Sequence, residues 1–188
     1  GVEYCDIMGA QHEIPLMVSA YQKGIRNYDV DKAYEAVKKT LTTQGTALSS
    51  GGIVGNRHLD VYLKYGFVPY GEKSHHNVFG TTYEGPTSNT LEYAFDDWNA
   101  AQFAKALGYE EDYDYFTRRA YNYKNVFDSE TKYVRPKYSD GTWMPDFEPI
   151  NKDEHSTSWS WLGSGFVEGN SWQYTWMVPH LSLIHISE

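Results

Sequence analysis

Apolar residues recur at the spacing of an α-helix along much of the chain, and polar segments separate these stretches. The first two predicted helices cover residues 15–23 and the stretch from Asp29 or Asp31, either of which can cap a helix, to Gln44. Because only residues 25–27 join them, we expect the two helices to form an antiparallel hairpin.

The strongest helical pattern covers residues 88–107, where the apolar face is broad enough to predict a helix buried on most sides. Further helices are predicted over residues 111–126, 59–65 and 170–177. Helices in pairs, with short links on one side and long aromatic links on the other, fit an α-hairpin toroid whose long loops carry a site. The same pattern also fits a solenoid of helical repeats.

The segments between the helices predict loops and one hairpin. Residues 46–55 are small and glycine-rich, and residues 70–86 and 147–165 lack helical periodicity. Residues 132–134 and 142–144 flank a Ser-Asp-Gly turn, which is typical of a β-hairpin. The fold class that follows is mainly α with a small β-hairpin.

Composition excludes some functions. The chain has 16 Lys plus Arg against 25 Asp plus Glu and no basic tract, so binding to nucleic acid is not expected. No stretch is long and apolar enough to span a membrane, and Cys5, the single cysteine, has no partner for an internal disulfide. The 17 Tyr and 6 Trp supply flat faces suited to stacking on sugar rings, although most will be core.

The most distinctive carboxylate is Glu168, which stands in an apolar and neutral run and is followed by Gly169 and Asn170. Gly169 permits a turn, and Asn170 or Ser171 can cap a helix that starts there. Aromatic surroundings raise the pKa of a carboxyl group, and a protonated carboxylic acid is what glycoside hydrolysis needs as general acid. The alternative is a loop glutamate beside a buried aromatic helix.

A second group of carboxylates lies in residues 90–98, where Glu92 and Asp96 are four apart and share a helix face. Glu92 is a candidate for binding sugar hydroxyls. The alternative is a first-turn glutamate favoured by the helix dipole, with Asp96 paired to a Lys or Arg. His12 precedes a predicted helix and either contacts a ligand or caps that helix.

Several of these stretches together resemble the signatures of glycoside hydrolase family 92, the calcium-dependent α-mannosidases. The clearest are residues 88–98, SNTLEYAFDDW, and residues 166–176, FVEGNSWQYTW. Residues 178–180, 20–25 and 33–36 match in the same order, and the similarity covers nearly the whole chain.

The resemblance implies an exo-acting, inverting mannosidase of α-1,2 type on an (α/α)6 toroid, acting on mannose-containing glycans. The Glu of the Glu-Gly-Asn motif is the family's general acid, and it corresponds to Glu168. The candidate substrate-binding residues are Glu92, Asn170, Trp172, Gln173 and His12. The resemblance also implies Ca2+ and a secreted, periplasmic or cell-surface location.

An inverting mechanism needs a second carboxylate to activate water. In the family this base, and much of the calcium shell, lie C-terminal to the matched segment, so no metal ligand is assigned here. We therefore expect residues 1–180 to be an internal part of the catalytic domain, inactive by itself. Residues 181–188 resemble a translated sequencing adaptor, and we expect them to be a non-native tail.

Two other functions remain open. Trp98, Gly108 and Tyr115 loosely match the pattern of a helical-repeat interaction module, although no period near that of such repeats occurs. Another sugar-active toroid, such as a glucosidase or trehalase, would use the same acid chemistry.

Overall fold

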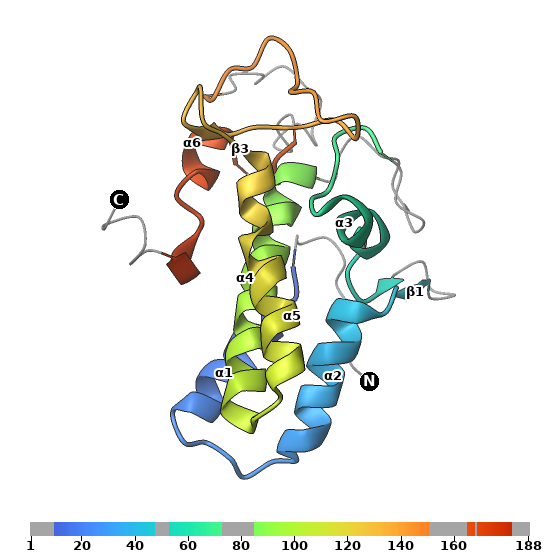
Figure 1. The fold of residues 1–188 in the computed structure, drawn as a ribbon, viewed down its shortest axis with the longest axis vertical. Coiled ribbons are helices and arrows are strands. Elements are labelled where there is room, and N and C mark those ends of the chain that lie inside the picture. The colour runs from blue at the N-terminus through green and yellow to red at the C-terminus, as the bar shows by residue number, and fades with distance from the viewer. Residues whose placement is uncertain (1–9, 48–52, 73–84, 151–164, 168, 182–188) are drawn as a thin grey trace.

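The computed structural model describes residues 10–47, 53–72, 85–150, 165–167 and 169–181, and this part of the chain is mainly α-helical (Figure 1). The predicted fold class is confirmed. Within these ranges, no helix has both the length and the apolar character needed to cross a membrane.

The helices are α1 (Glu13–Gln22), α2 (Val30–Thr42), α3 (Leu59–Tyr65), α4 (Pro86–Leu107), α5 (Glu110–Ala120) and α6 (Ser171–Tyr174), with 3-10 helices η1 (Tyr121–Val126) and η2 (Pro179–Leu181). The strands are β1 (Thr46–Ala47), β2 (Ile53–Val54), β3 (Phe127–Asp128) and β4 (Tyr133–Val134). Each of the six predicted helices is present, and the largest differences in extent are at α5 and α6, which are both shorter than predicted.

Helix α4 is the centre of the fold, and α1, α2 and α5 pack against it. Phe103 of α4 is fully buried, with its ring centroid 5.1 Å from that of Tyr21 on α1 and 5.5 Å from that of Tyr34 on α2. As predicted, a short segment joins α1 to α2. The apolar faces of these two helices both contact Phe103 of α4. Burial on most sides of α4 is confirmed.

Local capping explains where several helices begin and end. Asp29, rather than Asp31, caps α2, because its carboxylate accepts the Lys32 N–H at 3.0 Å. The helix predicted over residues 111–126 is two elements, since α5 ends at Ala120 and the backbone then tightens into η1.

Two predictions of strand structure are wrong. Residues 46–55, predicted as a loop, contribute β1 and β2, which pair antiparallel with Thr46 opposite Val54. Strand β4 pairs with β3, with Phe127 opposite Val134, and not with residues 142–144.

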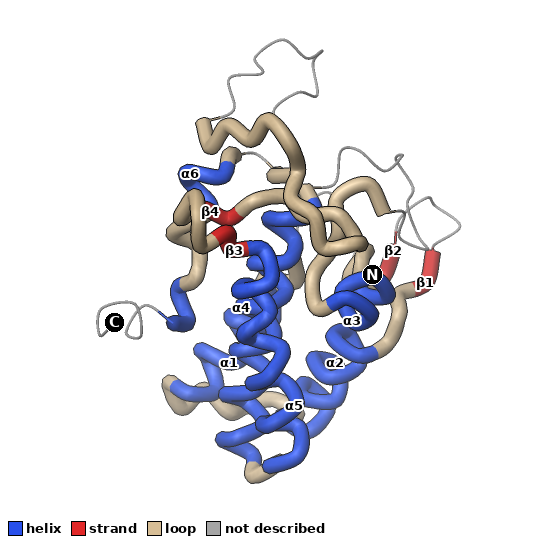
Figure 2. The backbone as a smooth tube through the Cα atoms, turned by 45° about the horizontal axis from the view of Figure 1, so that its top comes forward, coloured by secondary structure: helices blue, strands red, loops and turns tan. Residues whose placement is uncertain are grey.

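The turn between β3 and β4 shows why this pairing is favoured. Asp128 accepts the Glu130 N–H and the Thr131 hydroxyl, each at 3.0 Å, and binds Arg135 Nη1 at 3.0 Å. One buried carboxylate thus closes the turn that joins the two strands. The predicted Ser-Asp-Gly turn still forms, because the Gly141 N–H donates to the Tyr138 carbonyl at 3.0 Å. Figure 2 shows β3, β4 and α6 gathered at the end where α4 begins.

Candidate functional site

His12 and Glu92, two predicted substrate-binding residues 80 positions apart in the sequence, are in direct contact. His12 Nε2 lies 2.8 Å from Glu92 Oε2. His12 makes no side-chain cap to α1, so the capping alternative is wrong. Glu92 lies beyond the first turn of α4, which begins at Pro86, so the helix-dipole explanation for this glutamate is also wrong.

The two members of the His12–Glu92 pair differ in exposure. The side chain of His12 is 63% exposed, whereas that of Glu92 is 12% exposed. Burial raises the pKa of Glu92, and the hydrogen bond from His12 acts in the opposite direction. The pair thus offers two kinds of group to a ligand hydroxyl, the carboxylate of Glu92 and a ring nitrogen of His12.

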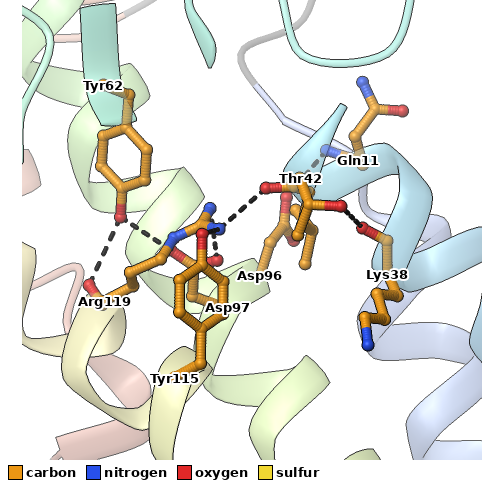
Figure 3. Close-up of polar contacts among 9 residues, drawn as sticks. Gln11, Lys38, Thr42, Tyr62, Asp96, Asp97, Tyr115 and Arg119 are labelled. Atoms are coloured by element: carbon orange, nitrogen blue, oxygen red, sulfur yellow. Dashed lines mark hydrogen bonds and ion pairs between the residues drawn. The ribbon is translucent and has the colours of Figure 1, made fainter. Parts of the chain in front are cut away.

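One turn further along α4, Asp96 is fully buried and its Oδ2 accepts the backbone N–H of Gln11 at 3.1 Å. The prediction that Asp96 pairs with a Lys or Arg is wrong, because its observed partner is the backbone of Gln11. The neighbouring Asp97 takes such a partner instead, with its Oδ1 2.7 Å from Arg119 Nη2. Successive residues of a helix point about 100° apart, so Asp96 faces Gln11, in the segment that precedes α1, while Asp97 faces Arg119 of α5 (Figure 3).

Asp97 belongs to a structural network. Its Oδ2 accepts the Tyr62 hydroxyl at 2.8 Å and Arg119 Nε at 3.1 Å. Burial raises the pKa of Asp97 to about 6, although Arg119 and Tyr62 both act to lower it. The group is thus ionised at neutral pH and serves as the counterion of Arg119.

Glu168 lies outside the described residues, but the chain before it is held closely. The Val167 N–H donates to Ser88 Oγ at 3.1 Å, and the Val167 carbonyl accepts the Tyr174 hydroxyl at 2.8 Å. Gly85 makes this close approach possible, because a Cβ at Gly85 would lie 2.5 Å from Val167 Cγ2.

The chain after Glu168 is held by α6. Asn170 Oδ1 accepts the Gln173 N–H at 3.1 Å, and Gln173 Oε1 accepts the Asn170 N–H at 3.0 Å, which is a capping box. Asn170 is therefore the cap, whereas the Ser171 hydroxyl donates to the Val134 carbonyl. Trp172 is 51% exposed. The substrate-binding roles of Asn170, Trp172 and Gln173 stay predictions.

These contacts share one side of α4, because Ser88, Glu92 and Asp96 are four residues apart. A step of four residues advances about 6 Å along a helix. The segment that leads into Glu168 and the His12–Glu92 pair are therefore neighbours on α4. Ser88 was not predicted as a site residue from the sequence. Its position four residues before Glu92 places it on the same helix face and could have indicated this role.

A metal centre is not formed by the described residues alone, since no group of three or more His, Cys, Asp or Glu side chains among them could hold an ion. The contacts of Glu92 and Asp96 are made instead with His12 and with the backbone of Gln11. This part of the chain does not fit a calcium site by itself.

Three kinds of comparison agree on relatives. A profile described as "Glycosyl hydrolase family 92 catalytic domain" matches residues 1–182. The chain is 27% identical to an "Uncharacterized secreted glycosidase" of Arthroderma benhamiae, covering 88% of this chain and 22% of that protein. It is 30% identical to a family GH92 inverting mannosidase from Bacteroides thetaiotaomicron, with a TM-score of 0.76, covering 94% of this chain and 21% of that one.

A GH92 α-mannosidase from the same organism, solved in complex with mannoimidazole, is 32% identical, with a TM-score of 0.70, 90% of this chain covered and 20% of that one. The chain thus spans about a fifth of the length of these relatives. The matches confirm the mainly α fold expected for part of the family's helical toroid. The family profile and the ordered motifs along α4 and α6 lead to one conclusion: this chain belongs to glycosyl hydrolase family 92.

Proposed function

We propose that the chain is part of the catalytic domain of an inverting α-mannosidase that removes terminal α-linked mannose, of α-1,2 type, from glycans. Family membership supports a glycosidase, and the mannosidase relatives support mannose as the sugar. The relative described as secreted supports an exported protein.

The observation that carries the proposal is the fixed backbone on both sides of Glu168. Ser88 and Tyr174 hold Val167, directly before Glu168, and the capping box holds Asn170, two residues after it. A general acid must be held within hydrogen-bonding reach of the glycosidic oxygen. In this proposal Glu168 protonates the leaving group, and a carboxylate elsewhere in the protein activates water.

The His12–Glu92 pair would bind hydroxyl groups of the terminal sugar. The Glu92 carboxylate can accept a hydrogen bond from a sugar hydroxyl, and the exposed imidazole of His12 offers a further ring nitrogen. Trp172 is half exposed and offers an indole face for stacking on a sugar ring. The mutual cap of Asn170 and Gln173 uses their side-chain oxygens, and each side chain also carries an NH2 group that can donate to a sugar hydroxyl.

The acid role is tested with Glu168→Gln in the full-length gene product, using an α-1,2-mannobiose and a dinitrophenyl α-mannoside. A poor leaving group needs protonation and a good one does not, so the variant should lose about 10²–10⁴-fold in kcat on the disaccharide and much less on the aryl substrate. The control is Glu110→Gln at the exposed start of α5. Equal losses on both substrates would remove Glu168 from this role.

Inversion and linkage are separate measurements. Proton NMR of the first-formed mannose should show the β-anomer, and α-1,2-mannobiose should react faster than its α-1,3 and α-1,6 isomers. A preference for glucosides would favour the alternative of another sugar-active toroid, and retention of configuration would contradict the inverting mechanism. A helical-repeat interaction module would show no turnover of any glycoside.

Calcium enters the proposal through the family resemblance, since the described residues do not form a site alone. A hard cation supplies Lewis-acid contacts to sugar hydroxyls. Activity should disappear on treatment with EGTA and return with added Ca2+ and not with Mg2+. The 188-residue chain alone should show no turnover, because the proposed base is outside it.

A further inference from the structure

Asp96 is a buried carboxyl group with no role in the mechanism described so far. Its side chain is 0% exposed, and Oδ2 accepts the Gln11 N–H at 3.1 Å. Oδ1 has no hydrogen-bond partner, and its surface is closed to solvent in the part of the chain that the structure describes. Burying a carboxyl group costs free energy. The presence of Asp96 at this position therefore needs an explanation, and its contact with Gln11 is the candidate.

The contact of Asp96 bears directly on the sugar-binding pair, because Gln11 immediately precedes His12. Consecutive residues of one segment thus bind successive turns of α4, Gln11 through its backbone to Asp96 and His12 through its ring to Glu92. The His12 side chain is largely exposed, and contacts of exposed side chains are weak on their own. The buried contact is therefore the one that can hold the segment.

We propose that Asp96 is a positioning residue that fixes His12 against Glu92 by binding the backbone N–H of Gln11. The proposal rests on the function proposed above for His12 and Glu92 as sugar-binding residues. It explains why a carboxyl group is retained inside α4, at a place where an apolar residue would pack but could not accept an N–H.

The charge state of Asp96 suits this role. Burial raises the pKa of Asp96 well above its usual value, the nearby carboxylates of Glu92, Asp97 and Glu13 raise it further, and the Gln11 N–H acts to lower it. The raised pKa disfavours the charged form of Asp96 and so reduces its repulsion of Glu92, and the carboxyl group can accept the Gln11 N–H in either form. Asparagine is the closest neutral mimic, because its amide oxygen can accept the same N–H.

The kinetic test compares Asp96→Asn, Asp96→Ala and Asp96→Leu in the full-length gene product with mannobiose. We expect the alanine and leucine variants to raise KM about tenfold with kcat changed much less, because a binding residue is displaced. The asparagine variant should stay within about twofold of wild type. Leucine has the same number of side-chain heavy atoms as aspartate and leaves no cavity, so it serves if the alanine variant does not fold.

A matched control is Asn99→Ala, another buried polar residue of α4, whose amide donates within its own helix, to the Phe95 carbonyl at 2.9 Å. This control should lower Tm without raising KM. The Asp96 variants should also be made in a His12→Ala background, where a positioning residue that acts through His12 has nothing left to position. Equal increases in KM in both backgrounds would show that Asp96 is merely structural.

A second measurement does not depend on activity. Crystal structures of the full-length variants should keep the contact of 2.8 Å between His12 Nε2 and Glu92 Oε2 in Asp96→Asn and lose it in Asp96→Leu. An intact contact in the leucine variant would overturn the positioning role. If no mannoside is turned over by the wild type, the proposed function fails, and this distance still decides the role of Asp96.

Discussion

Arg119 of α5 and Asp97 of α4 form a buried ion pair, with Nη2 2.7 Å from Oδ1 and side chains 9% and 0% exposed. Arg119 Nη1 also donates to the Leu41 carbonyl of α2 at 2.8 Å, and Tyr62 of α3 donates to Asp97 (Figure 3). A single guanidinium–carboxylate pair thus connects four helices. The stability of the fold should depend on it.

Arg119→Lys should be strongly destabilising. A lysine cannot reproduce the planar fork that binds both Asp97 and the Leu41 carbonyl, and a buried charge left poorly paired costs about 3–5 kcal/mol. The measurement is the urea midpoint of the full-length gene product. Arg118→Lys, at the exposed neighbouring position, is the control and should change the midpoint little. Equal shifts in the two variants would contradict the structural role of the pair.

Asp96 should make the folded state less stable as the pH rises. Its pKa is raised well above the unfolded value of 3.8, so between these two values unfolding releases a proton. The wild type should therefore lose about 1.4 kcal/mol of unfolding free energy per pH unit relative to Asp96→Asn in that range. Urea unfolding of both proteins from about pH 5 upward measures the difference, which also cancels the titration of other groups. If the difference in unfolding free energy between the two proteins does not vary with pH, Asp96 is already ionised in the folded state and the prediction is wrong.

Gly85→Ala should disrupt the segment that leads into Glu168. The new Cβ would lie 2.5 Å from Val167 Cγ2 and 2.6 Å from the Val167 nitrogen, at a backbone φ of +52°. Gly24→Ala is the matched control, because Gly24 has φ +85° with nothing within 4 Å of a Cβ. The control should show only the cost of a left-handed residue, about 1–2 kcal/mol. Gly85→Ala should lower Tm further and reduce kcat; equal effects would show that Val167 moves freely aside.

Tyr174→Phe should impair catalysis more than folding. The variant loses the hydroxyl that donates to the Val167 carbonyl at 2.8 Å but keeps the ring, whose centroid is 5.6 Å from that of Phe166. One hydrogen bond contributes about 0.5–1.5 kcal/mol, so the loss of Tm should be small. If this bond orients Glu168, kcat on mannobiose should fall several-fold while KM changes little. Tyr121→Phe, a partly exposed tyrosine, serves as control, and equal kcat values in both variants would exclude the orienting role.

The helices were the most predictable part of the fold. The pattern over residues 88–107 differs from α4 (Pro86–Leu107) by two residues at its start, because helical hydrogen bonds join residues four apart and the burial pattern is visible locally. Strand pairing was less predictable. By sequence pattern alone, residues 142–144 are an acceptable partner for β4. In the structure β4 pairs with β3 instead, because the carboxylate of Asp128 closes the turn between these two strands.

The amino-acid sequence was sufficient to predict the helical fold class, the family motifs and Glu168 as the candidate acid, because each is carried by residues close together in the chain. Three contacts depend on how the helices pack: His12 with Glu92, Asp96 with Gln11, and Asp97 with Arg119. These contacts join positions 22 to 85 residues apart. The physical reason is that helical spacing shows which side chains share a face, whereas the packing of helices decides what each face meets.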